Sequence, residues 1–186
     1  MQRKEYIQHY DSPLGGMLLS SDGESLTGLW FDGQKYFAST LNEENAIDAE
    51  LAVFDDTKRW LDLYFKGVQP DFLPALHLIG TPFRQRVWQS LMRIPRGELT
   101  TYAAISREIA TECKEGTMSA QAVGGSVGHN PISIIIPCHR VVGSNGSLTG
   151  YASGIDRKIA LLRLEGIDTD KLSEPKLDLI APTVAD

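Results

Sequence analysis

The sequence predicts two parts: a small α/β module with a β-sheet and a helix, and a mainly helical domain that contains a helix-turn-helix. Residues 1–40 hold short apolar runs separated by turn signals, whereas 81–166 shows the apolar spacing of helices. A stretch with two prolines, VQPDFLPALHLIG, separates them. The expected boundaries are 1–75 for the N-terminal module, 76–170 for the C-terminal domain and 171–186 for a polar tail.

Three runs in the N-terminal module are typical of β-strands: YIQHY at 6–10, GGMLLSS at 15–21 and LTGLWF at 26–31. The turn sequences DSPLGG and SDGES lie between them. DDTKRWLDLYFKG then predicts a helix that is capped by Asp55 or Asp56 and ends at Gly67. These elements make up the predicted α/β module.

The C-terminal domain opens with Thr81 as a helix N-cap and Pro82 as the first helical residue. YAAISREIA predicts a second helix and SAQAVGGSVGHN a third, short one that is rich in small residues. Joined by a loop, they are a helix-turn-helix candidate, although such pairs are also common packing units. The isoleucine run that follows predicts a buried strand, and IDRKIALLRLEG predicts a last helix ending at Gly166.

Charge is distributed unevenly along this chain of net charge −6. Residues 1–80 carry 6 basic and 13 acidic side chains, a balance of −7. Residues 81–166 carry 10 basic and 6 acidic side chains, a balance of +4, and residues 167–186 carry 2 basic and 5 acidic side chains, a balance of −3. Only the middle part therefore suits a phosphate backbone, with random drift of surface charge as the alternative explanation. The N-terminus has no apolar signal region, and no apolar run approaches the roughly 18 residues of a membrane span. We expect a cytoplasmic protein without membrane contacts.

The sequence IIIPCHRVVG places Cys138, His139 and Arg140 directly after an apolar run. A metal site lacks further ligands at suitable spacing, and the two cysteines, Cys113 and Cys138, exclude a disulfide framework, so we expect free thiols and no metal. A thiol hydrolase needs a histidine in direct reach of sulfur, but neighbours on extended backbone point to opposite faces. A water could still carry the proton between them. A buried structural cysteine is the default interpretation, but it leaves the histidine and the arginine unexplained.

This segment resembles the active-site signature of the O6-alkylguanine-DNA alkyltransferases, the methylated-DNA–protein-cysteine methyltransferase family. The resemblance covers about 81–166, including TPFRQRVWQSLMRIPRGELTTYAAIS, AVGGSVGHNPISIIIPCHRVVG and GYASG with LLRLEG. It implies a ribonuclease-H-like N-terminal module and a winged-helix-like helix-turn-helix. It also implies irreversible, stoichiometric transfer of the methyl group from O6-methylguanine, and less from O4-methylthymine, to a cysteine. The implied protein is a monomer that acts on alkylated double-stranded DNA without any cofactor.

The resemblance assigns roles to five catalytic residues. Cys138 corresponds to the acceptor thiol, His139 to the residue that activates it through a water, and Glu165 to the carboxylate that orients the histidine. Tyr102 corresponds to the tyrosine that hydrogen-bonds the flipped nucleotide and protonates the departing guanine. Asn130 corresponds to the asparagine that braces the turn before the active-site segment.

The resemblance also implies that the small-residue helix enters the minor groove of DNA, where its alanines and glycines permit close approach. Tight helix packing is the alternative explanation for these small residues. Gln121 stands where the family usually has an arginine that fills the gap left by the flipped base, which puts the efficiency of flipping in question. Arg140 falls at the signature arginine, which looks structural. The expected DNA-binding residues are Gln121, Ala122, Gly124, Tyr102 and Arg140.

Two other functions remain as alternatives. One is an alkyltransferase-like protein that binds the lesion without transfer; such relatives lack the acceptor cysteine, which this chain has at position 138. The other is a transcription factor switched by its own methylation, which would need a regulatory module. Residues 1–75 contain no cysteine cluster for one.

Overall fold

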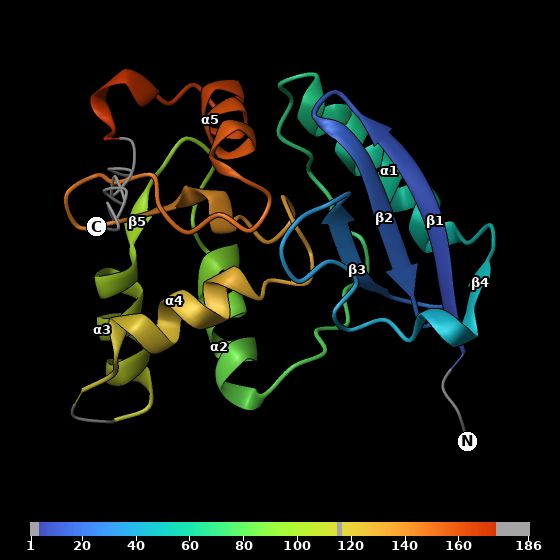
Figure 1. Ribbon diagram of the computed structural model, residues 1–186, viewed down its shortest axis with the longest axis horizontal. Helices are drawn as coiled ribbons and strands as arrows, with labels where there is room; N and C mark the ends of the chain where they lie inside the picture. The colour runs from blue at the N-terminus through green and yellow to red at the C-terminus, as the bar shows by residue number, and fades with distance from the viewer. Residues whose placement is uncertain (1–3, 115–116, 174–186) are drawn as a thin grey trace, which may run out of the picture.

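Over its described residues, the N-terminal domain is a four-stranded sheet with one α-helix packed on a face (Figure 1). Strands β1 (Glu5–Ser12), β2 (Gly15–Ser21) and β3 (Leu26–Phe31) are antiparallel, and β4 (Ala46–Asp48) pairs parallel to β1, in the order β3-β2-β1-β4. The three predicted strands are confirmed. The short β4, with two of its three residues exposed, carries no apolar signal and was not predicted. The structure, a computed structural model, describes residues 4–114 and 117–173, so the predicted tail lies outside the described residues from 174 onwards.

Helix α1 (Ala52–Phe65) covers the sheet and shares its core. Its predicted cap at Asp55 or Asp56 is wrong, because the helix begins at Ala52 and Leu51 stands at the N-cap without a side-chain cap. Burial of Val53 and Phe54 against the sheet explains the earlier start, since tertiary packing outweighs the capping signal. The opposite face of the sheet is covered by the loop after β3, which brings Ala38 against Leu18 and Trp30.

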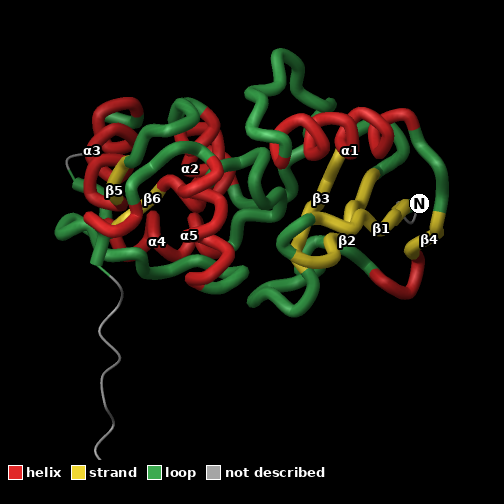
Figure 2. The backbone as a smooth tube through the Cα atoms, turned by 90° about the horizontal axis from the view of Figure 1, so that it is seen from above, coloured by secondary structure: helices red, strands yellow, loops and turns green. Residues whose placement is uncertain are grey.

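In the part of the C-terminal domain that the structure describes there are four α-helices: α2 (Pro82–Met92), α3 (Tyr102–Glu112), α4 (Ala120–Gly128) and α5 (Ile155–Leu164). Thr81 caps α2 as predicted, with its hydroxyl accepting from the Arg84 backbone N–H. The indole of Trp88 donates to the Ser126 carbonyl over 2.9 Å and fastens α2 to α4. A parallel ladder between β5 (Thr100–Thr101) and β6 (Val141–Val142) completes the domain, and Figure 2 shows the two domains side by side.

The segment before Cys138 is not the strand that the isoleucine run predicts. Ile132 forms an isolated bridge with Leu29, and the chain then makes turns in which Ile134 has φ 69°, an uncommon value for a β-branched residue. All of residues 130–136 are nevertheless buried. A continuous apolar run therefore marks a buried segment without fixing its backbone conformation.

The free edge of β3 joins the two domains. Leu29 N–H donates to the Pro131 carbonyl and the Leu29 carbonyl accepts from Ser133 N–H, both over 2.8 Å. Leu26 N–H donates to the Ala75 carbonyl of the linker, and the Leu26 carbonyl accepts from His77 N–H. The sheet edge thus holds both the linker and the segment that leads to Cys138, and the apolar core is continuous across the domains. Among the described residues, none of the helices has the length and apolarity to cross a membrane.

Candidate active site

Cys138, His139 and Arg140 form a 3-10 turn rather than the extended backbone assumed from the sequence. Pro137 precedes the turn, and all three side chains are buried, with exposed fractions of 7%, 0% and 7%. Three consecutive buried residues with thiol, imidazole and guanidinium groups require internal partners. The structure provides them from both domains.

The side chain of Asn130 contacts both the backbone before this turn and the thiol within it. Its side-chain Nδ2 donates to the Ile136 carbonyl over 2.7 Å and lies 3.1 Å from Sγ of Cys138, while its Oδ1 accepts from Ile132 N–H. One buried amide therefore fixes the backbone before the thiol and also donates to the sulfur. A donor in this position favours the thiolate over the thiol.

His139 is paired with Glu165, at the C-terminal end of α5. Nε2 of the imidazole lies 2.7 Å from Oε1 of Glu165, and Nδ1 forms no hydrogen bond to any protein atom of the described residues. Burial lowers the pKa of His139 and outweighs the hydrogen bond and charge of Glu165, which raise it, while the charges of Arg140 and Lys158 add to the lowering. The imidazole is therefore neutral near pH 7, with its proton on Nε2 facing the carboxylate and Nδ1 left as the acceptor.

Glu165 is the shared hydrogen-bond acceptor of the buried polar groups. It accepts from Nε and Nη2 of Arg140 over 2.8 and 2.9 Å, from the hydroxyl of Tyr64 over 2.7 Å and from Gly97 N–H over 3.4 Å, in addition to His139. Burial by itself raises the pKa of Glu165, but the hydrogen bonds and charges of His139 and Arg140 outweigh it and hold this pKa well below its usual range. The carboxylate is ionised at neutral pH.

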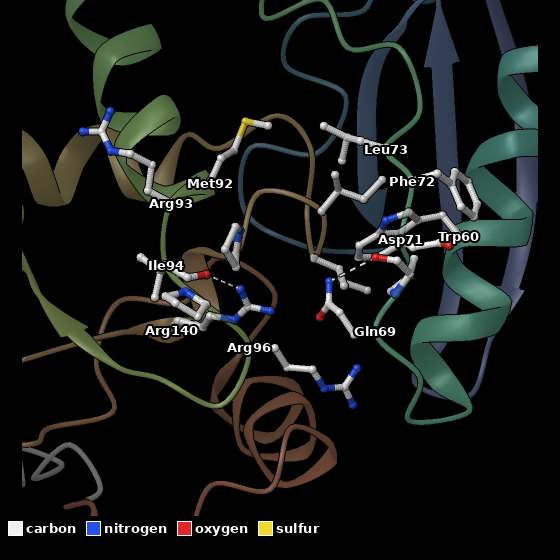
Figure 3. A pocket seen from close by; sticks show the side chains of 15 residues that line it. Trp60, Gln69, Asp71, Phe72, Leu73, Met92, Arg93, Ile94, Arg96 and Arg140 are labelled. Carbon is white, nitrogen blue, oxygen red and sulfur yellow. Dashed lines mark hydrogen bonds between the residues drawn. The ribbon is translucent and has the colours of Figure 1, made fainter.

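Arg140 is engaged inside the molecule, as the structural interpretation of the signature arginine suggests. Besides Glu165 it binds the Ile94 carbonyl over 2.6 Å. This side borders a cavity of about 410 Å³ between the domains, and Figure 3 shows Arg140, Ile94, Trp60 and Arg96 around it. The structure therefore does not bring Arg140 to the exposed helix face that carries Gln121 and Ala122.

Lys158 supplies a positive charge beside the thiol. Its side chain is fully buried on α5, donates to the carbonyls of Val141 and Thr149, and has a pKa lowered to about 8 by burial. Burial raises the pKa of Cys138, while the Asn130 hydrogen bond and the Lys158 charge act in the opposite direction. The resting sulfur is therefore a thiol that needs a base to become nucleophilic.

Sequence reasoning missed Lys158 and Tyr64. Lys158, Leu161, Leu162 and Glu165 recur at the spacing of one helix face, so a lysine on the buried stripe of α5 was a signal available in the sequence. Tyr64 carries no such signal, because its partner lies 101 residues away in the other domain.

Helix α4 presents its small residues outwards. Ala120, Gln121, Ala122 and Gly125 are exposed, so tight helix packing does not explain these positions. Gly124 differs, because a Cβ there would lie 3.7 Å from the Tyr102 ring, in ordinary contact. The result is a helix face of low relief that is open to solvent.

Tyr102 lines a hollow of about 460 Å³ together with Gln121, Gly124, Thr149 and Gly150. Its hydroxyl donates to the Thr149 carbonyl over 3.2 Å, and its pKa is raised to about 12 by burial and by the nearby Cys138. A Cβ at Gly150, which has φ 80°, would lie 2.7 Å from this hydroxyl, so only glycine fits there. A second hollow of about 270 Å³ adjoins Gly124 and Gly150 and is lined by Tyr151 and, from the N-terminal domain, by Lys35 and Tyr36.

These features define a protein whose buried cysteine adjoins a histidine–carboxylate pair and lies next to an outward-facing helix-turn-helix. In the described residues, no three His, Cys, Asp or Glu side chains are grouped so that they could hold a metal ion. Residues 82–167 match the model for the DNA binding domain of 6-O-methylguanine DNA methyltransferase, and residues 6–75 match the ribonuclease-like domain of the same protein. The chain belongs to the 6-O-methylguanine DNA methyltransferase family.

Relatives cover most of the chain. The methylated-DNA–protein-cysteine methyltransferase of Mycobacterium leprae is 41% identical over 86% of this chain and 92% of its own, and that of Haemophilus influenzae is 41% identical over 87% of each. The crystal structure of Mycobacterium tuberculosis O6-methylguanine methyltransferase superposes with a TM-score of 0.73, at 41% identity and 87% and 92% coverage. The crystal structure of Mycobacterium tuberculosis OGT in complex with DNA superposes with a TM-score of 0.75. It is 39% identical, and the match covers 90% of this chain and 94% of that one.

Proposed function

We propose that Cys138 accepts the methyl group of O6-methylguanine in DNA and keeps it, so that each protein molecule acts once. This chain is a methylated-DNA–protein-cysteine methyltransferase that repairs O6-methylguanine, as its family membership and its relatives establish. The observation that carries the role of Cys138 is its position: a buried thiol that contacts Asn130 and adjoins the His139–Glu165 pair. The other cysteine, Cys113, is half-buried and contacts Arg86 instead.

The first step of the proposed mechanism is removal of the thiol proton. Neutral His139 takes it at Nδ1 through a water, and the ionised Glu165 stabilises the imidazolium that forms. Asn130 and Lys158 stabilise the thiolate. Because burial raises the pKa of Cys138, this relay is needed at neutral pH.

The second step is displacement at the methyl carbon. The sulfur forms a bond to this carbon while the carbon–O6 bond breaks, and the released electron pair stays on guanine. Tyr102 donates a proton to the departing guanine, which a pKa of about 12 permits, and recovers one from His139 through solvent. The products are a thioether and guanine, and a thioether does not regenerate the thiol.

The methyl group lies within the base stack, so we infer that the nucleotide is flipped out of the duplex. The hollow beside Tyr102, Gly124 and Gly150 supports this proposal, since it opens beside the exposed face of α4. The low relief of Ala122 and Gly125 suits close approach to a minor groove. We propose alkylated double-stranded DNA as the partner of a monomer, with O4-methylthymine as a lesser substrate.

Mass spectrometry after mixing with O6-methylguanine DNA tests the acceptor. We expect one added methyl group per molecule, mapped to the Cys138 peptide, and no further repair after one equivalent. Cys138→Ala should abolish transfer and retain DNA binding, whereas Cys113→Ala should transfer normally. A methyl group on Cys113, or repair beyond one equivalent, would overturn the assignment. DNA binding without any transfer would instead favour a lesion-binding protein.

A further inference from the structure

Tyr64 links the N-terminal domain to the catalytic pair of the C-terminal domain. It lies on α1, is 1% exposed, and its hydroxyl donates to Oε1 of Glu165 over 2.7 Å. The same hydroxyl lies 3.4 Å from Nε2 of His139. A side chain of the sheet-and-helix domain therefore reaches the two groups that the proposed relay uses.

The Tyr64 ring is held by its neighbours. Trp60 stacks on it at a centroid distance of 5.4 Å and an angle of 10°, and Phe65 meets it edge-on at 5.5 Å. The guanidinium of Arg96 lies 5.3 Å from the ring centroid and is anchored by a 3.0 Å bond to the Leu164 carbonyl. Trp60 and Arg96 both line the cavity in Figure 3. The packing of α1 thus determines where the hydroxyl lies.

The two oxygens of Glu165 have different partners. Oε2 binds Arg140 Nε and Gly97 N–H, whereas Oε1 binds His139 Nε2, Arg140 Nη2 and the Tyr64 hydroxyl. Tyr64 is the one donor of this set that the N-terminal domain contributes. Burial, reinforced by the charge of Glu165, raises the pKa of Tyr64 far above its usual value, so the hydroxyl stays a donor.

We propose that Tyr64 is a positioning residue for methyl transfer: its hydroxyl holds Oε1 of Glu165 against Nε2 of His139, so that the imidazole presents Nδ1 to the thiol proton. This inference rests on the proposed function of His139 as the base. The relay then depends on both domains, because the C-terminal domain by itself lacks the Tyr64 hydroxyl that donates to Glu165. The N-terminal domain then acts on the chemistry through one hydrogen bond.

Tyr64→Phe tests the proposal, with Tyr10→Phe as the matched control. Tyr10 also donates to a carboxylate over 2.7 Å, that of Asp62 on α1, and does not contact Glu165. We expect Tyr64→Phe to slow single-turnover transfer at pH 7 by roughly 10-fold, equal to about 1.4 kcal/mol of activation free energy. Tyr10→Phe should leave the rate unchanged. The Tyr64→Phe deficit should narrow at alkaline pH, where hydroxide forms the thiolate without the relay.

A second comparison uses the His139→Gln background, in which the relay is absent. There Tyr64→Phe should cause no further slowing, because the residue acts through His139. Equal slowing in both backgrounds, a deficit that does not depend on pH, or a rate equal to that of Tyr10→Phe would each overturn the proposal. If His139→Gln itself left the rate unchanged, the proposed base would be wrong, a result distinct from failure of Tyr64 alone.

Discussion

Nε2 of His139 lies 2.7 Å from Oε1 of Glu165, and neither side chain is exposed to solvent. The carboxylate also bears two hydrogen bonds from Arg140, so its charge is balanced within the buried cluster. Its low pKa keeps it an acceptor, and the lowered pKa of His139 keeps the imidazole neutral. This pairing fixes the tautomer and thereby leaves Nδ1 as the basic atom.

Glu165→Gln should lower both the stability and the rate. Removing one partner of a buried ion pair leaves Arg140 uncompensated, and such changes cost about 3–5 kcal/mol of unfolding free energy. Transfer at neutral pH should slow and recover partly as the pH rises, because hydroxide then supplies the thiolate. Urea unfolding and single-turnover rates measure the two effects. Unchanged rates at every pH would contradict the relay.

Glu165→Gln should also make the free energy of unfolding less sensitive to acid. Because the pKa of Glu165 is lower in the folded protein, its ionised form stabilises the fold above the unfolded-state pKa, near about 4.3, and this contribution is lost as pH falls below that value. Wild type should therefore lose more unfolding free energy than Glu165→Gln between pH 6 and pH 3. Parallel stability curves would argue against the lowered pKa.

Lys158→Met should raise the pKa of Cys138 further and slow transfer near pH 7. A loss of about 1.4 kcal/mol of thiolate stabilisation corresponds to roughly a 10-fold lower thiolate fraction. Because Lys158 loses its own proton near pH 8, wild type and variant should converge above that pH. Lys66→Met, at an exposed position after α1, serves as the control in the pH–rate profile. A constant ratio of rates across pH would mean that Lys158 acts by packing.

The sequence predicted strands β1, β2 and β3, the N-cap of α2 and the helix-turn-helix, because these depend on local apolar spacing and on residues such as Thr81 and Pro82. It failed where tertiary packing decides, as at the start of α1 and in the turns around Ile134. The roles that the resemblance implied for Asn130 and Glu165 stay predictions, which their contacts with Ile136 and His139 support. Tyr64 could not be found, since its contact with Glu165 arises only when the two domains pack together.

Binding to undamaged DNA should depend only weakly on salt. Arg140 and Lys158 are buried, and Arg93 is paired with Glu108 and Glu112, so fewer than the ten basic side chains of residues 81–166 can meet phosphates. With a few contacts, log affinity against log salt should have a slope of roughly −2 to −5, at about 0.9 per phosphate. Fluorescence anisotropy with an undamaged duplex at several salt concentrations measures this slope. A slope near zero would show that this surface does not face DNA.

Gln121→Arg tests the position at which this chain departs from its family's usual residue. Gln121 is exposed near the start of α4 and lines the hollow with Tyr102. Unstacking a nucleotide costs a few kcal/mol of free energy. If an arginine here offsets part of this cost by filling the space left by the flipped base, glutamine offsets less of it. Gln121→Arg should then speed repair in duplex DNA by roughly 10-fold, which corresponds to about 1.4 kcal/mol.

The comparison with single-stranded substrate separates flipping from chemistry. A short single strand needs no flipping, so Gln121→Arg should hardly change its rate of repair, and the duplex-to-single-strand ratio is the quantity to measure. Gln89→Arg, the same substitution at an exposed position of α2 beside the linker, controls for added positive charge. An equal gain on both substrates would mean that position 121 acts on general binding or chemistry. No gain on either would mean that glutamine, or a neighbour such as Ser119, already fills the gap, because the duplex would then have no uncovered flipping cost for arginine to remove.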